Sequence, residues 1–220
     1  MANPHRYGFR FLKNRWGGDT PEITTGFLAS GYQPSNGAVT VNLNIGDPVK
    51  RLDSGAFALA TPGELDDDDA DERVFGVVAG FPQVLINGAV RPNAYYPSGT
   101  VYGSNLDAQT LVQVIPAEGA VWEIDTATTS SSFDTKAEFQ AIIGSVARIV
   151  YSAINTTTVN PKANPFIELS FGESTIVRQL RVVGLGRGFE QYDLTLANVP
   201  LQVTFNQVQA SPWRTAGSLE

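Results

Sequence analysis

The chain has 220 residues, of which 42% are apolar and 10% aromatic, so it is able to form a sizeable core and does not have the composition of a disordered protein. It contains no cysteine, which excludes disulfides and cysteine-ligated metal sites, and no apolar run of about 18 residues, so we expect no membrane partner. The net charge of −7 equals the seven acidic residues of positions 64–72, so acidity is a local feature of this chain.

The first predicted unit, residues 1–30, is an extended N-terminal arm that is basic and rich in aromatic residues. Its candidate partner-binding residues are Arg6, Tyr7, Phe9, Arg10, Phe11, Arg15 and Trp16. Arginine and aromatic side chains are enriched at protein interfaces, so we expect the arm to bind a neighbouring protein subunit. Packing of the arm on its own domain is a second interpretation. Nucleic acid is a third, but four positive charges bind phosphate weakly and the acidic run would repel a polyanion, so we expect no nucleic-acid partner.

Alternation of apolar and polar residues predicts β-strands through the following β-rich body, residues 31–220. In the segment 38–45 the residues expected to face the core are Val39, Val41, Leu43 and Ile45. Residues 74–81 are apolar at nearly every position, which predicts a strand covered on both faces, with glycines that mark a bulge. Further alternating strands are expected near residues 122–125, 167–171, 176–182 and 201–206.

One segment, residues 133–145, has the features of a short helix: Thr135 and Glu138 have capping-box spacing, and Gly144 is able to end it. Strands and helices do not alternate, so we predict an all-β fold, mainly antiparallel, of small β-barrel or sandwich architecture with at most one or two short helices. A seam near residues 88–100 would divide the body into a small β-barrel at 31–90 and a second β unit at 91–220.

Three patterns suggest chemistry, but their spacing does not support it. In the acidic run, a calcium loop starting at Asp67 would place Glu72 at its glycine position and Val78 at its glutamate position, so we predict a solvent-facing loop tip. The glycines of residues 184–188 lack the following helix that a phosphate site needs. The single histidine, His5, lies in the arm and leaves none for a catalytic triad. We therefore expect no enzymatic activity, no cofactor and no metal site.

Five short motifs follow one another in the order seen in a known family. They are GDPV at 46–49, GVVAG at 76–80, WEID at 122–125, LRVVGL at 180–185 and VTFN at 203–206. With this order and spacing the chain resembles the capsid decoration, or cement, proteins of tailed bacteriophages. It departs from the family after LRVVGL, where an acidic, Asn-rich segment is usual and this chain has GRGFEQYDLTLANVP.

The resemblance implies a structural virion protein, made in the host cytoplasm, that binds the outer surface of the capsid and clamps neighbouring major capsid subunits. It also implies a homo-oligomer, a dimer or trimer. A clamp that binds the expanded shell preferentially stabilises that state. An alternative is a carbohydrate- or receptor-binding β module of a phage fibre or spike, suggested by Tyr95, Tyr96 and Tyr102. A glycan-cleaving enzyme is a third hypothesis, which needs a carboxylate pair that sequence alone does not identify.

Overall fold

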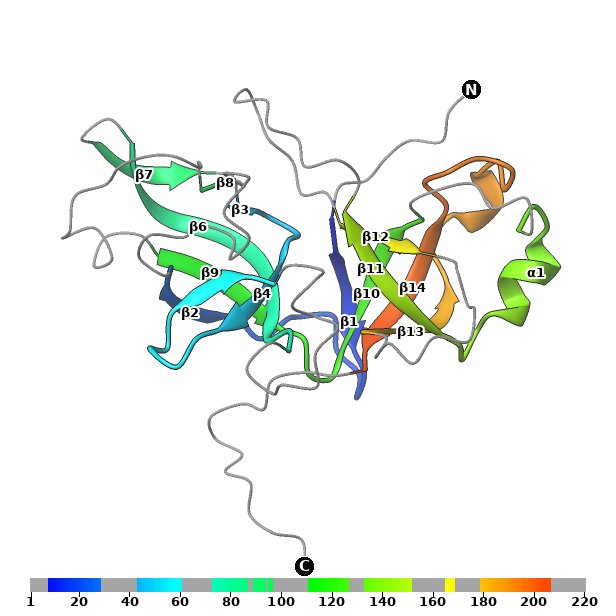
Figure 1. Cartoon of the computed structure of the whole chain (residues 1–220), viewed down its shortest axis with the longest axis horizontal. Helices are drawn as coiled ribbons and strands as arrows, with labels where there is room; N and C mark the ends of the chain where they lie inside the picture. The colour runs from blue at the N-terminus through cyan, green and yellow to red at the C-terminus, as the bar shows by residue number, and fades with distance from the viewer. Residues whose placement is uncertain are drawn as a thin grey trace, which may run out of the picture.

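The computed structural model describes residues 8–28, 43–60, 73–86, 89–93, 95–96, 111–126, 133–151, 165–168 and 179–206. Two antiparallel sheets lie side by side, and a short α-helix lies at the outer end of one of them (Figure 1). The mainly antiparallel all-β fold predicted from the alternation pattern is confirmed.

The first sheet brings together strands from both ends of the described chain. Its order is β1 (Arg10–Asn14), β10 (Ala120–Asp125), β14 (Pro200–Phe205), β13 (Leu180–Leu185), β11 (Val146–Tyr151) and β12 (Pro165–Glu168). The helix α1 (Lys136–Ala141) precedes β11, and a 3₁₀ turn, η2 (Phe189–Gln191), follows β13. All neighbouring strands in this sheet are antiparallel.

The second sheet is formed by strands that lie between β1 and β10 in the chain. Its order is β2 (Thr24–Phe27), β9 (Leu111–Pro116), β6 (Gly76–Ile86), β4 (Pro48–Arg51) and β5 (Phe57–Leu59), and β7 (Ala89–Asn93) also pairs with β6. A separate ladder joins β3 (Leu43–Asn44) to β8 (Tyr95–Tyr96). Among the described residues this sheet does not close into a barrel, and an isolated bridge between Leu28 and Phe57 joins its two edges.

Described strands from both sides of the predicted seam near residues 88–100 share one sheet, because β6 pairs with β9. The chain passes between the two sheets at residues 15–23 and 117–119. Within the predicted arm, β1 pairs with β10 in the first sheet and β2 pairs with β9 in the second. This part of the arm is therefore not a free extension.

Two clusters of buried apolar side chains hold the sheets together. The larger cluster centres on Trp122, and it includes Val74 and Val77 from the second sheet and the segment preceding it. The smaller cluster is formed by residues of the second sheet and its flanking segments, and it includes Phe57 and Phe81. Because the larger core takes residues from both sheets, the two sheets are packed against each other.

Local sequence signals explain several elements. Helix α1 begins with the predicted capping box, in which the Thr135 side chain accepts from the Glu138 N–H and the Glu138 side chain accepts from the Thr135 N–H. The strand at 74–81 is buried on both faces, as predicted, and its register shifts at Gly80.

The expected alternation over residues 38–45 is wrong at its end. Ile45 is exposed and Asn44 is buried, because Asp47 Oδ2 accepts from both the backbone N–H and the side-chain amide of Asn44 and begins a turn there. Residues 38–42 lie outside the described residues.

Candidate docking surface

The structure separates the predicted partner-binding residues into buried and exposed groups. Phe9 is 4% exposed, and its ring centroid lies 5.0 Å from that of Phe205 and 6.3 Å from that of Trp122. Phe11 is partly buried, with its ring 5.8 Å from Trp122 in an edge-on geometry. These two aromatic side chains therefore belong to the core of the first sheet. Arg6 and Tyr7 lie outside the described residues.

Arg10 joins β1 to β10 by electrostatic contacts. Its Nε donates to Glu123 Oε1 at 3.2 Å, and its Nη2 donates to Asp125 Oδ1 at 2.7 Å. Both carboxylates are buried, although their positions in the alternating β10 pattern suggested a solvent-facing side. Glu123 also accepts the backbone N–H of Arg187 at 2.6 Å. Arg10 is therefore part of the fold, and its guanidinium is directed at this chain.

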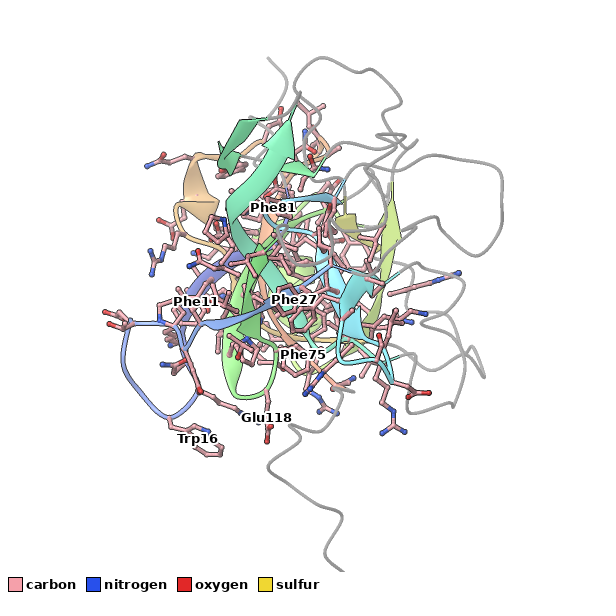
Figure 2. The ribbon with its side chains drawn as sticks, turned by 90° about the vertical axis from the view of Figure 1, so that its left-hand side faces the viewer. Phe11, Trp16, Phe27, Phe75, Phe81 and Glu118 are labelled. Atoms are coloured by element: carbon pink, nitrogen blue, oxygen red, sulfur yellow. The ribbon has the colours of Figure 1, made fainter. Side chains whose placement is uncertain are left out.

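Arg15 and Trp16 remain on the surface, in the connection from β1 to β2. Trp16 is 87% exposed, the largest exposure of any large apolar side chain in the described ranges. Figure 2 shows Trp16 projecting from one end of the molecule beside Glu118 of the β9–β10 turn. A Cβ placed on Gly119 of that turn would lie 3.2 Å from Trp16 Nε1, so the indole lies close over a position without a side chain.

The backbone around Trp16 is fixed by hydrogen bonds. Residues 14–20, named here the Trp16 turn, contain bonds from the Asn14 N–H to the Gly18 carbonyl and from the Gly17 N–H to the Asn14 carbonyl, and the Asn14 side chain donates to Thr20. The Arg15 N–H donates to the Gly119 carbonyl and ties this turn to the β9–β10 turn. Gly17 and Gly18 have φ values of 100° and 94°, which favour glycine. The exposed indole is thus held on an ordered support.

A second apolar feature lies on the outward face of β2. Ile23 and Phe27 are 50% and 48% exposed, and Thr25 between them is also exposed. On β9, Leu111 lies opposite Phe27 and Gln113 opposite Thr25, and both are only partly buried. These five uncharged residues are named here the apolar strip. Three of the six exposed large apolar side chains in the described part of the chain therefore lie between residues 16 and 27.

Charged residues surround the Trp16 turn but are absent from the apolar strip. Lys13 and Arg15 lie on one side of Trp16 in the chain, and Asp19 and Glu22 on the other, and all are exposed. Glu118 adds a carboxylate beside the indole (Figure 2). A surface with an apolar anchor and a mixed-charge rim has the anatomy of a protein-binding site.

The sequence identified Trp16 but not Ile23 or Phe27. The only signal for them was the spacing of two apolar residues around Thr25 at alternate positions, and period-two spacing does not tell an outward face from an inward one. Gly26 determines which face of β2 points inward, because its position lies against the core: a Cβ there would lie 2.5 Å from the Phe57 ring.

The residues considered for other chemistry are placed as follows. In the described ranges, no group of three or more His, Cys, Asp or Glu side chains is arranged to hold a metal ion, and no helix is long and apolar enough to cross a membrane. The acidic run 64–72, His5 and Tyr102 lie outside the described residues. Tyr95 and Tyr96 form β8, whose side chains are likewise outside the description.

The glycine-containing segment after β13 forms a tight turn. Gly188 has a φ of 68° and is followed by the three-residue 3₁₀ turn η2. The Arg187 side chain is exposed in this turn.

Three carboxylates with perturbed acidity lie near α1 and η2, away from the Trp16 turn. Hydrogen bonds from the Asp134 N–H and from Thr135 lower the pKa of Glu138. A hydrogen bond from Lys136, at 2.6 Å, and its charge lower the pKa of Glu190. Hydrogen bonds from Thr195 lower the pKa of Asp193. All three groups are accounted for by local capping and pairing.

Comparison with known proteins finds no relative: no family model, no curated protein and no solved structure matches this chain.

Proposed function

We propose that this protein is a structural virion protein that binds the outer surface of a tailed-phage capsid and clamps neighbouring major capsid subunits. The observation that carries the proposal is Trp16, an 87% exposed indole held on a hydrogen-bonded turn. The apolar strip supplies a second contact area. The order of the five sequence motifs supports the choice of a capsid as the partner.

The energetic argument rests on the state of Trp16 before binding. An exposed tryptophan is costly to leave in water, and burying about 200 Å² of it contributes roughly 5 kcal/mol before the cost of association. Because the turn is already ordered, little conformational entropy is lost when the indole enters a pocket. Tryptophans of this kind are frequent hot spots of binding.

The five motifs of the resemblance coincide with ordered backbone. GDPV forms the turn into β4, GVVAG begins β6, WEID ends β10, LRVVGL is β13 and VTFN ends β14. These motifs build the two sheets and their shared core, so they support a rigid body and do not themselves contact a partner. In the proposed clamp, the binding residues are those of the Trp16 turn and the apolar strip.

The direct test is to add the protein to expanded phage capsids (heads) that were assembled without it. Its occupancy on these heads is then measured by cosedimentation and by cryo-electron microscopy. Trp16→Ala is expected to lower the affinity at least tenfold while the thermal unfolding temperature is unchanged. The matched control is Ile143→Ala, which removes an exposed apolar side chain from the turn after α1 and is expected to bind normally. Absence of the wild-type protein from heads would contradict the proposal.

A carbohydrate-binding module is the second candidate, because Trp16 lies beside Glu118, and an aromatic face next to a carboxylate also suits a sugar. A glycan array separates the two. Reproducible glycan binding that is lost in Trp16→Ala, together with no binding to heads, would support this candidate.

A further inference from the structure

We infer that strand β2 pairs edge to edge with β2 of a second copy of this chain, giving a two-fold symmetric dimer. The use of this dimer as a clamp rests on the proposed function, but the pairing itself does not. The inference comes from the edge position of β2, its composition and the pattern of its outward face.

Strand β2 is one edge of the second sheet. Within the described ranges it pairs along its length with β9, and the opposite edge, β5, reaches it at the Leu28–Phe57 bridge. The Phe57 ring fills the space under Gly26. Among the described residues, the part of this edge without a paired strand is therefore residues 23–27, with its inward side already packed.

This edge carries none of the lysine, proline or charged residues that prevent strand pairing, and its four-residue length limits the pairing to a short segment. Protected edges carry lysine, proline or inward-pointing charges, whereas β2 reads Thr-Thr-Gly-Phe. The flanking Ile23 is apolar and half exposed. An uncharged edge with exposed apolar residues is a template for an added strand.

The outward face of β2 is complementary to itself. Antiparallel pairing centred on Thr25 places Thr25 opposite Thr25 of the second copy and Ile23 opposite Phe27 at both ends. Thr–Thr and aromatic–β-branched pairs are among the favourable cross-strand pairs. Pairing is confined to residues 23–27, because Phe57 already bridges Leu28 on this edge, and none of these five residues is charged. A second copy therefore fits this edge without like-charge repulsion.

The symmetry of this pairing bears on the proposed clamp. Continuing a sheet across an antiparallel pair places the two-fold axis perpendicular to the sheet, so the apolar strips of both copies lie on the same face. The same rotation places the two Trp16 turns at the same height along the two-fold axis. A dimer would thus present two equivalent anchors to a shell, and the second would bind at a raised effective concentration.

The test is a charge swap at the two-fold centre, followed by sedimentation velocity over a range of protein concentrations. The wild-type protein is expected to show a monomer–dimer equilibrium. Thr25→Lys and Thr25→Glu, each alone, place like charges opposite each other and are expected to raise the dimer Kd about tenfold. An equimolar mixture of the two variants is expected to regain dimers. Gln140→Lys and Gln140→Glu, on the exposed face of α1, are the matched controls and should leave the wild-type Kd unchanged.

The outcomes distinguish the pairing from the proposed function. Three results would overturn the proposed pairing, whether or not the protein binds capsids. They are a wild-type protein that stays monomeric, one that forms a trimer, and a dimer Kd that Thr25→Lys and Thr25→Glu leave unchanged. Failure of the mixture to regain dimers would also overturn the Thr25-centred register. A dimer that responds to the swap but does not bind heads would leave the pairing standing and contradict the proposed function alone.

Discussion

Replacement of Arg10 by methionine is expected to destabilise the fold by about 3 kcal/mol, because Arg10 neutralises two buried carboxylates. Its guanidinium contacts Glu123 at 3.1 Å and Asp125 at 2.7 Å, and the acidic side chains are only 3% and 1% exposed. Methionine keeps most of the apolar length of the arginine side chain, so the loss measured reports the charge and its hydrogen bonds.

The magnitude follows from the burial of the two acids. Removing one member of a buried ion pair costs about 3 to 5 kcal/mol, because the remaining charge stays in a poorly solvated site. Arg10 itself is 24% exposed, which favours the lower end of that range. For a domain of this size, a loss of about 3 kcal/mol corresponds to a fall in Tm of roughly 6 to 12 °C.

Urea unfolding followed by tryptophan fluorescence measures this loss. Lys13→Met, on the exposed side of the same strand, is the control and should leave the free energy of unfolding unchanged. Adding Asp125→Asn to Arg10→Met is expected to recover part of the stability, since it removes one of the two buried negative charges that Arg10 contacts. If Arg10→Met unfolds within about 1 kcal/mol of the wild type, the ion pairs do not hold β1 on β10, and the reasoning is refuted.

Three further changes test other parts of the fold. The pKa of Glu138 in the folded protein lies below its ordinary value of 4.5, chiefly through the Asp134 N–H, so its contribution is present above pH 4.5 and is lost as the pH falls through the lower folded value. Glu138→Gln should therefore make the free energy of unfolding depend less steeply on pH under acidic conditions. An unchanged pH dependence would contradict the capping role. Gly76→Ala places a Cβ against the Ile115 carbonyl and is expected to lower the free energy of unfolding, measured in urea, by about 2 kcal/mol. An unchanged free energy would show that β6 and β9 are able to separate at this position. Phe9→Ala should cost about 4 kcal/mol in the same assay, and a surface-like loss under 1 kcal/mol would contradict its burial in the core.

Alternation of apolar residues predicted the strands best where one face is buried and the other is not. In β13, Leu180 and Val182 are buried and the alternate residues Arg181 and Val183 are exposed, as expected from their spacing. The pattern failed at Asn44 and Ile45, because a side-chain hydrogen bond from Asn44 to Asp47 turns the backbone before the alternation ends. Such local polar contacts compete with strand pairing, and a hydrophobicity pattern does not contain them.

Composition did not separate core from surface in the N-terminal segment. Phe9 and Trp16 are both large aromatic residues in a basic stretch, yet one is buried and the other is almost fully exposed. The difference is set by β10, which is more than a hundred residues away in the chain and receives β1. The same distant contact explains why Glu123 is buried: its counter-ion Arg10 comes from β1. Contacts of this range are not visible in a single sequence.

The topology suggests how the proposed clamp would carry load. The second sheet is inserted between β1 and β10, so its two covalent connections to the first sheet leave from neighbouring strands. One connection contains Trp16 and the other contains Gly119, and a backbone hydrogen bond from Arg15 to Gly119 joins them. A partner that holds Trp16 would therefore pull on the point where both sheets are tied together. Force from an expanding shell would then be distributed over the two packed cores. If the anchor lay on a long loop, the same force would act only on the few backbone torsion angles of that loop.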